Sequence, residues 1–252
     1  MARGKKQIPG QLSFSFCLDT ENYVVQSNGI VGGKQALSLN SAKLIRAAIM
    51  QISPEDKELK PYVISIAELA ILLGVPRSNL YRDIDEITNN IISHPVFVKA
   101  QNGKRIAWVK IPWVQRCEYV SDAGVAIKLN DELKPFLLQL QGNYTQYTLD
   151  SVLSMKSVYS IRIFELLLEA IKQGRNPLPK EGRDAELTIR NIRECCDCED
   201  KYTRYSQFKA RVIEKALQEI NSKTMYRVSY TEKKKGHAVE SLIFNINTFY
   251  HL

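Results

Sequence analysis

The stretch Tyr202–Ile246 reads YTRYSQFKARVIEKALQEINSKTMYRVSYTEKKKGHAVESLIFNI, and it decides the fold of the second half of the chain. Its first part predicts a helix over Arg204–Ser222, and two strand-like runs follow at Met225–Thr231 and Val239–Ile246. The apolar residues of the helix recur every three or four positions and form one stripe: Phe208, Val212, Ile213, Ala216, Leu217 and Ile220. A helix followed by a hairpin is the order of a winged helix.

The opposite face of this helix is polar. Gln207, Arg211, Lys215 and Gln218 lie on it, and Arg204 and Lys209 stand near its start, with Ser206 as the expected N-cap. Arg can pair with guanine N7 and O6, and Gln with adenine N6 and N7. Lysine recognises charge better than base identity, so we expect Lys209 and Lys215 to contact phosphates. The plainer alternative is a solvated amphipathic helix.

Positive charge is concentrated in this part of the chain. The whole chain of 252 residues has a formal net charge of +8, and the stretch 201–252 holds ten Lys or Arg against four Glu, a net of +6. Lys233, Lys234 and Lys235 stand next to His237 at the expected hairpin tip, where they suit backbone phosphates or the minor groove. The alternative role for these lysines is solubility alone.

The first half repeats the order helix, strand, helix, helix, hairpin between about Leu37 and Leu140. Ser38 opens a helix, Tyr62–Ile64 is a short strand, and Ser65 with Glu68 forms a capping box before a second helix. That helix breaks at Gly74, and a further helix begins near Pro76. Two short helices joined by a tight turn predict a helix-turn-helix.

The predicted wing of the first half is the hairpin formed by Val96–Lys99 and Ile106–Val114, whose Asn102-Gly103 turn puts Lys104 and Arg105 at its tip. Further expected elements are a strand at Val125–Leu129 and a helix at Asp131–Leu140. The start of the helix after Pro76 could read a second groove segment, through Arg77, Ser78, Asn79, Tyr81 and Arg82. Acidic residues follow it closely, so it could equally be a packing or dimerisation surface.

The second half continues this order upstream of Arg204. We expect a helix at Ser157–Gln173, a loop at Arg175–Arg183, a strand at Ala185–Thr188 and a helix at Ile189–Cys196. The segment 142–156 is the expected joint between the halves. Its first part, Gly142–Asp150, is polar without a periodic apolar pattern, and it could form the start of a helix that continues through Val152, Leu153 and Met155.

Composition excludes several classes. No apolar run is long enough for a membrane span, and the basic start of the chain lacks the apolar run of a secretory signal. The cysteines, Cys17, Cys117, Cys195, Cys196 and Cys198, are odd in number and unevenly spaced, which favours reduced thiols in a cytosolic protein. There is no GxxxxGK phosphate loop and no His-x-His cluster of a rolling-circle nickase. We therefore expect no enzyme, cofactor or metal site.

The stretch Tyr202–Ile246 resembles the C-terminal winged helix of the iteron-plasmid replication initiators, most clearly in ALQEINSKT and VSYTEKKKG. Upstream, Tyr144–Leu167 (YTQYTLDSVLSMKSVYSIRIFELL) resembles the segment that joins the two domains of that family. The resemblance implies an α+β, helix-rich fold of two tandem winged-helix domains in a pseudo-twofold arrangement. The expected ranges are a basic tail (1–19), an N-terminal winged helix (20–141), an interdomain segment (142–156) and a C-terminal winged helix (157–252).

The resemblance also implies a function. Family members bind direct repeats at a plasmid origin as monomers, repress their own gene as dimers formed through the N-terminal domain, and recruit host replication proteins. The family's base-reading positions match Arg204, Gln207, Ala210 and Arg211, to which we add Ser206. Gln207 replaces an acidic residue and Ala210 an arginine, so we expect a different repeat sequence. The alternative is a winged-helix transcription regulator without a replication role.

Overall fold

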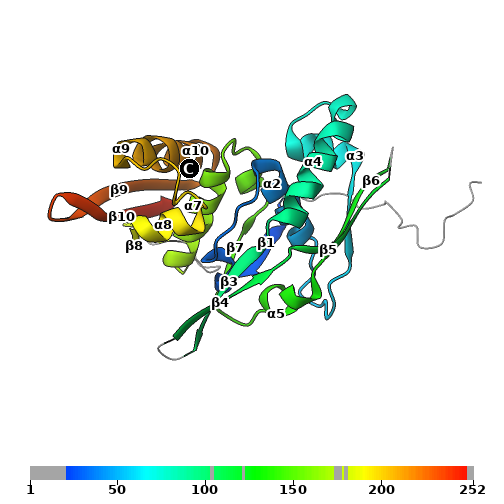
Figure 1. Ribbon diagram of the computed structural model, residues 1–252, viewed down its shortest axis with the longest axis horizontal. Coiled ribbons are helices and arrows are strands. Elements are labelled where there is room, and N and C mark those ends of the chain that lie inside the picture. Colours follow the sequence, from blue (N-terminus) through cyan, green and yellow to red (C-terminus); the bar gives the residue numbers. More distant parts are fainter. Residues whose placement is uncertain (1–20, 103–104, 121–122, 173–177, 179–180, 249–252) are drawn as a thin grey trace, which may run out of the picture.

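The computed structural model describes residues 21–102, 105–120, 123–172, 178 and 181–248. The described chain forms two winged helices with a two-stranded sheet between them (Figure 1). The predicted basic tail, residues 1–19, lies outside the described residues, as does most of the loop predicted at Arg175–Arg183.

The second winged helix has the predicted order of elements. Its elements are α7 (Val158–Ala170), β8 (Arg183–Thr188), α8 (Ile189–Cys195), α9 (Tyr205–Phe208), the π-helical turn η3 (Lys209–Glu214), α10 (Lys215–Lys223), β9 (Tyr226–Lys235) and β10 (Ala238–Thr248). The strands form one antiparallel sheet in the order β8-β10-β9. The inward residues predicted on α7, such as Phe164 and Leu168, are buried. These observations confirm the winged helix predicted for the second half.

The first winged helix also contains the predicted helix-turn-helix. Its elements are α2 (Leu39–Met50), β2 (Pro61–Ser65), α3 (Ile66–Leu73), the 3-10 turn η1 (Arg77–Asn79), α4 (Leu80–Ser93), β3 (Val96–Asn102), β4 (Arg105–Ile111), β5 (Val114–Val120) and β6 (Gly124–Leu129). Ser65 and Glu68 make the predicted capping box, and Gly74 ends α3 with a left-handed φ of 67°. The helix predicted from Pro76 begins later, at Leu80, because a 3-10 turn comes first.

The wing predicted for the first half is wrong. The hairpin β3–β4 forms a sheet of its own, whereas β2 pairs with β6, and β6 with β5. The order β2-β6-β5 corresponds to β8-β10-β9, so β5–β6 is the wing and β3–β4 is inserted before it. Gly124 lets β6 approach β2, since a Cβ there would lie 2.2 Å from the Ile64 carbonyl oxygen. An Asn-Gly turn predicts a hairpin, but not which hairpin joins the main sheet.

The segment 142–156, predicted as a polar joint, contains a strand. In the central sheet β1 (Tyr23–Ser27) pairs antiparallel with β7 (Tyr144–Thr148), flanked by the short helices α1 (Asn28–Val31) and α6 (Asp150–Leu153). The buried residues of β7 are Thr145 and Tyr147, whose polar groups hide the period of two in the sequence. The helix predicted at Asp131–Leu140 is also shorter, comprising η2 (Asp131–Leu133) and α5 (Lys134–Leu137).

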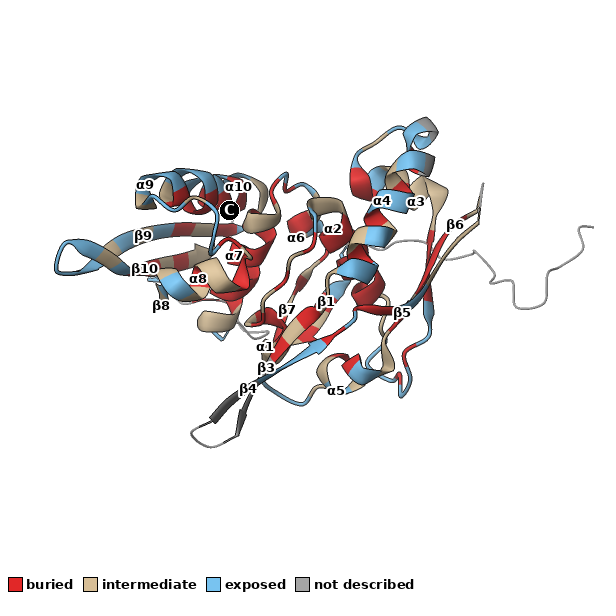
Figure 2. Ribbon diagram, viewed as in Figure 1, coloured by how far each residue is buried: buried red, intermediate tan, exposed pale blue. Residues whose placement is uncertain are grey.

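One hydrophobic core runs through both winged helices and the central sheet. Figure 2 shows buried residues continuing from α2 through β1 and β7 to α7. Strand β1 packs against α2, and β7 packs against α7. The central sheet therefore joins the two winged helices into one packed body.

Candidate nucleic-acid interface

The helix that runs from α9 through η3 to α10 separates its two faces as the sequence predicts. All six residues of the apolar stripe are buried. The predicted base-reading residues are all exposed: Arg204, Ser206, Gln207, Ala210 and Arg211. Lys215 and Gln218 continue the same exposed face. The helix is thus anchored by one face and exposed on the other, and Ala210 and Arg211 lie in the π-helical turn η3.

The predicted N-cap at Ser206 is wrong. The helix begins at Tyr205, and Arg204 occupies the cap position without a side-chain cap bond. The Arg204 carbonyl accepts from the backbone amides of Gln207 and Phe208, both at 3.1 Å. Tyr202, two residues before Arg204, has a left-handed φ of 52°. Ser206 therefore lies inside the first turn of the helix, with its side chain exposed.

Arg193, at the end of α8, holds the turn that leads into this helix. Its Nη1 donates to the carbonyls of Cys198 (3.2 Å) and Lys201 (2.8 Å), and its Nη2 donates to that of Tyr202 (2.8 Å). The guanidinium group also stacks on the Phe208 ring, with Cζ 4.2 Å from the ring centroid. This role of Arg193 could not be predicted from the sequence, since a single arginine on a short helix carries no signal of its own.

The three consecutive lysines of the wing lie on two different faces of its sheet. They lie in strand β9, and the turn is only Gly236-His237, with Gly236 at a φ of 63°. Side chains alternate between the two faces of a strand, so Lys234 shares a face with Glu232, whereas Lys233 and Lys235 lie on the other. Lys233 Nζ lies 3.0 Å from Glu186 Oε1, and Lys235 Nζ lies 3.5 Å from Glu240 Oε1.

Glu232 joins the wing to the start of the helix that runs from α9 to α10. Its Oε1 accepts from Lys209 Nζ (2.9 Å) and from the Tyr205 hydroxyl (2.8 Å). The hydrogen bond with Lys209, and then that with Tyr205, lowers the pKa of Glu232, and the same bond with Glu232 raises the pKa of Lys209. Because Lys234 lies on the face of Glu232, it is on the side of the sheet that meets the helix. Lys209, a predicted phosphate contact, is thus held by an acid in the absence of DNA.

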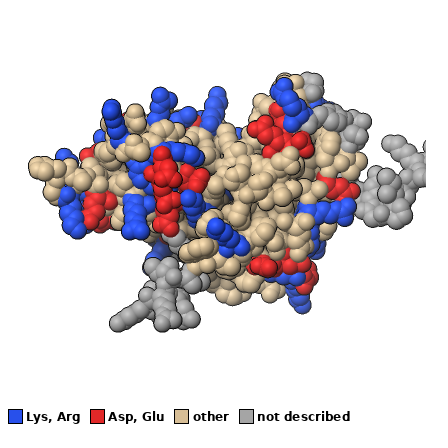
Figure 3. All heavy atoms as spheres, viewed as in Figure 1, with Lys and Arg blue, Asp and Glu red and all other residues tan. Residues whose placement is uncertain are grey.

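The helix-turn-helix of the first domain carries a different surface. Arg77, Asn79 and Arg82 are exposed, and Arg82 Nε lies 3.3 Å from Asp83 Oδ1. Asp85 and Glu86 are exposed next to them. The side chains of Ser78, Tyr81 and Arg105 and all of Lys104 lie outside the described residues. In Figure 3 basic side chains stand out over α9, α10 and their hairpin, and acidic side chains gather around α8 as well as near α3 and α4.

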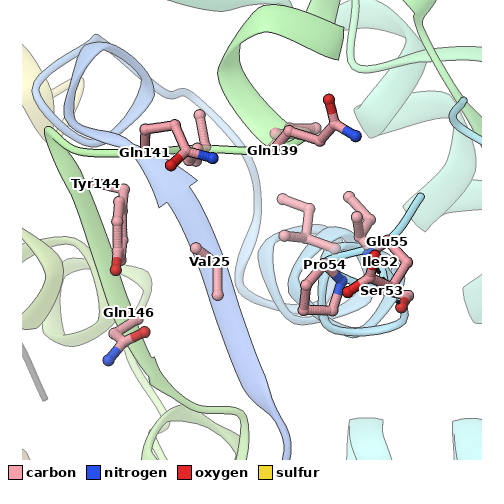
Figure 4. Close-up of a pocket in the computed structure, with 12 residues that line it drawn as sticks. Val25, Ile52, Ser53, Pro54, Glu55, Gln139, Gln141, Tyr144 and Gln146 are labelled. Atoms are coloured by element: carbon pink, nitrogen blue, oxygen red, sulfur yellow. Dashed lines mark hydrogen bonds between the residues drawn. The ribbon is translucent and has the colours of Figure 1, made fainter. Parts of the chain in front are cut away.

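The described chain has further features besides these exposed surfaces. A pocket of about 500 Å³ lies between the loop after α2, the segment after α5 and the central sheet, with Gln139, Gln141 and Gln146 among its lining residues (Figure 4). Cys196 and Cys198 are buried, and burial raises the pKa of both thiols. In the described ranges no three His, Cys, Asp or Glu side chains gather as metal ligands would, and no helix has the length and apolarity of a membrane span.

Comparisons with known proteins assign the family. The family model described as "Initiator Replication protein, WH1" matches residues 23–168, and "Initiator Rep protein, WH2" matches 188–246. A replication initiation protein of Escherichia coli is 21% identical over 231 residues, covering 90% of this chain and 70% of the relative. An uncharacterized 27.6 kDa protein of Escherichia coli is also 21% identical, covering 87% of this chain and 93% of the relative.

A solved structure has the same fold. The Pi initiator protein, crystallised in complex with iteron DNA, superposes with a TM-score of 0.73 at 18% identity, covering 91% of this chain and 98% of that protein. The family favours a replication initiator over a transcription regulator without a replication role. With both domain models matched in order along the chain, this protein belongs to the family of initiator replication proteins, composed of the two winged-helix domains WH1 and WH2.

Proposed function

We propose that this protein initiates plasmid replication by binding direct repeats of duplex DNA at the origin. The recognition helix α9–α10 enters the major groove, and the β9–β10 wing follows the adjacent backbone. The observation that carries this proposal is the exposed polar face of Arg204, Gln207 and Arg211 on a helix whose other face is fully buried. The Pi initiator, which shares the fold, was crystallised with iteron DNA, and this supports the same class of ligand here.

The exposed face has the chemistry for base reading. Arg204 and Arg211 can each donate two hydrogen bonds to a guanine, and Gln207 can pair with an adenine. Ala210 presents a methyl group that suits the methyl group of thymine. Ser206 can bond to either kind of base edge. Since Gln207 and Ala210 depart from the family's pattern at these positions, the repeat should differ from those of relatives.

Basic side chains around the helix supply contacts to phosphate. The set proposed for this role is Lys209, Lys215, Lys233, Lys234, Lys235 and His237. Lys209 must exchange Glu232 for a phosphate when DNA binds, whereas Lys234 already lies on the side of the sheet that meets the recognition helix. Each lysine that neutralises a phosphate releases counterions, so binding weakens steeply with salt.

The first domain has a secondary role in this proposal. Its candidate DNA contacts are Arg77, Ser78, Asn79, Tyr81, Arg82, Lys104 and Arg105. We propose that the same domain forms the homodimer, that the dimer binds an inverted repeat and represses the protein's own gene, and that host replication proteins join the complex at the origin. The protein acts in the bacterial cytoplasm and without catalysis, so supercoiled origin DNA incubated with protein and magnesium should not be nicked.

A footprint on origin DNA from the same replicon tests the proposal. We expect protection of several head-to-tail repeats and permanganate reactivity in adjacent A·T-rich DNA, which reports unpaired thymine. A transcription regulator would protect an inverted repeat and leave the A·T-rich segment paired. Equal affinity for the repeats and for scrambled DNA of the same composition would contradict the proposal.

A further inference from the structure

Glu165, on α7, is a fully buried carboxylate with four hydrogen-bonding partners. Its Oε1 accepts from Arg46 Nε (3.0 Å), Gln26 Nε2 (2.8 Å) and the Tyr147 hydroxyl. Its Oε2 accepts from Arg46 Nη2 (2.9 Å) and Arg162 Nη1 (2.5 Å). The partners come from α2, β1, β7 and α7, so one carboxylate ties the first domain, the central sheet and the second domain together.

Arg162 extends this network to the helix-turn-helix of the second domain. Its Nη2 donates to the carbonyls of Val31 (2.6 Å) and Gly33 (2.9 Å), and its Nε donates to that of Cys195 (3.4 Å). Cys195 is the last residue of α8, where a cation is favoured by the helix dipole. Arg46 Nη2 also donates to Gln35 Oε1 at 2.8 Å. We call the six side chains the Glu165 cluster: Gln26, Gln35, Arg46, Tyr147, Arg162 and Glu165.

The charges in this cluster favour one geometry over others. Burial on its own would raise the pKa of Glu165, but the charges of Arg46 and Arg162 lower it to about 2, so the carboxylate is ionised. Apolar side chains of similar size could stabilise such an interface as well, but they would not require one orientation. A guanidinium bound to both oxygens of a carboxylate fixes angle and distance together. The cluster is therefore suited to hold two domains in one register.

We propose that the Glu165 cluster is a positioning site that fixes the register between α4 of the first domain and the helix α9–α10 of the second. The protein then accepts only one spacing between the two DNA segments that its domains contact. This inference rests on the proposed function, because it requires that both domains contact the same duplex. It assigns Arg46 and Glu165 a role in DNA recognition although both are buried away from the interface.

Insertions in the DNA test this proposal. Once footprints of the whole protein have located the two contacted segments, two base pairs are inserted between them, which moves one segment by about 7 Å and about 70° relative to the other. The wild-type protein should lose at least about tenfold in affinity, since only one domain can then dock. Arg46→Met removes the bond between α2 and α7 but leaves the Arg162–Glu165 pair. The insertion should lower the affinity of this variant by less than about threefold.

Two further variants separate positioning from stability. Leu69→Ala opens a cavity in α3, which packs against elements of the first domain, and it should keep the wild-type loss despite its lower stability. Arg46→Lys keeps the charge, but a single ammonium group cannot span both carboxylate oxygens. The affinity that Arg46→Lys loses on insertion should also be smaller than the wild-type loss. This variant can be used for the test if Arg46→Met does not fold.

The outcomes distinguish this inference from the function on which it rests. A wild-type protein that binds scrambled DNA as well as the repeats would contradict the proposed function. A wild-type protein that prefers the repeats but tolerates the insertion would overturn the positioning role. So would Arg46 variants that remain folded and lose as much affinity on insertion as the wild type does.

Discussion

The two winged helices share one order of elements, but their surfaces carry net charges of opposite sign. The segment 77–93 of the first has two Arg against three acids, a net of −1, whereas the segment 204–223 of the second has five Lys or Arg against two Glu, a net of +3. Both place a helix after a helix-turn at the surface of the same packed body. The fold provides the shape that fits a groove, and the exposed side chains decide which copy binds a polyanion strongly.

The wings of the two domains also differ in charge: the second wing is the more basic. The second wing has strands of ten and eleven residues and carries three lysines. The first has strands of seven and six residues, and its Arg116 Nη2 lies 2.7 Å from Glu118 Oε2. A long basic hairpin can follow a DNA backbone, while a short hairpin with paired charges has little attraction for it. We therefore expect the affinity for DNA to come mainly from the second domain.

The two domains are held in one packed body, and acid should weaken the Glu165 cluster that joins them. The pKa of Glu165, about 2 in the folded protein, lies below its ordinary value of 4.5. A depressed carboxyl pKa stabilises the folded state above the unfolded pKa, so this stability is lost as the pH falls from about 5 to about 2. We expect a loss of about 3 kcal/mol in the free energy of unfolding, measured by urea denaturation.

The matched control is Arg46→Met/Glu165→Gln, which lacks the titrating group while the cluster keeps its net charge through Arg162. It should lose less stability than the wild type over the same pH range. Equal losses would show that the acid sensitivity arises elsewhere.

One exposed arginine from each domain tests which domain contributes more to DNA affinity. Arg211→Ala should lower the affinity for the origin repeat by about 1–3 kcal/mol and affect random DNA less, because a bidentate contact to guanine is lost. Arg82→Ala, in the first domain, should have a smaller effect, since Arg82 is 84% exposed and lies beside Asp83. Affinities by fluorescence anisotropy on both DNAs check this. Equal effects of the two substitutions would mean that the second domain does not dominate DNA binding.

Lysines on the two faces of β9 should affect the salt dependence of DNA binding differently. Lys234→Ala should reduce the slope of log affinity against log salt by about 0.9, the value for one phosphate contact. Lys233→Ala should reduce it less, because Lys233 is bound to Glu186 on the far face of the sheet. Titrations between low and moderate salt measure both slopes. A larger change for Lys233 would place the DNA on the other side of the wing.

The smallest expected effect concerns Glu232. Glu232→Gln removes a negative charge from the interface and frees Lys209 for phosphate, so non-specific binding at low salt should tighten by about 0.5 kcal/mol. Glu118→Gln, the matched change beside Arg116 in the first wing, should leave binding unchanged. Weaker binding by Glu232→Gln would mean that holding Tyr205 matters more than the charge.

The sequence predicted the parts of the fold that have local signals. The stripe Phe208–Ile220 and the capping box at Ser65 each follow from residues close in the chain, and both are confirmed. The first wing was misassigned because β3–β4 and β5–β6 are consecutive hairpins, and only pairing with the distant β2 distinguishes them. Strand β7 was missed because its buried residues are Thr145 and Tyr147.

The candidate site was predictable in composition but not in arrangement. The exposure of Arg204, Gln207 and Arg211 follows from helical period, whereas the separation of Lys234 from its neighbours needed the strand boundary at Lys235. The Glu165 cluster could not be foreseen, since Gln26, Arg46 and Glu165 are up to 139 residues apart in the chain. Buried ionic contacts between distant residues leave no periodic signal in one sequence.

Photo-crosslinking can show directly whether the helix α9–α10 and the β9–β10 wing contact the origin repeat. With 5-iodouracil placed at successive positions of the repeat, we expect crosslinked peptides from 204–218 and from the wing at 232–237, as identified by mass spectrometry. Crosslinks confined to the first domain, or found only on surfaces away from α9, α10 and β9, would contradict this expectation.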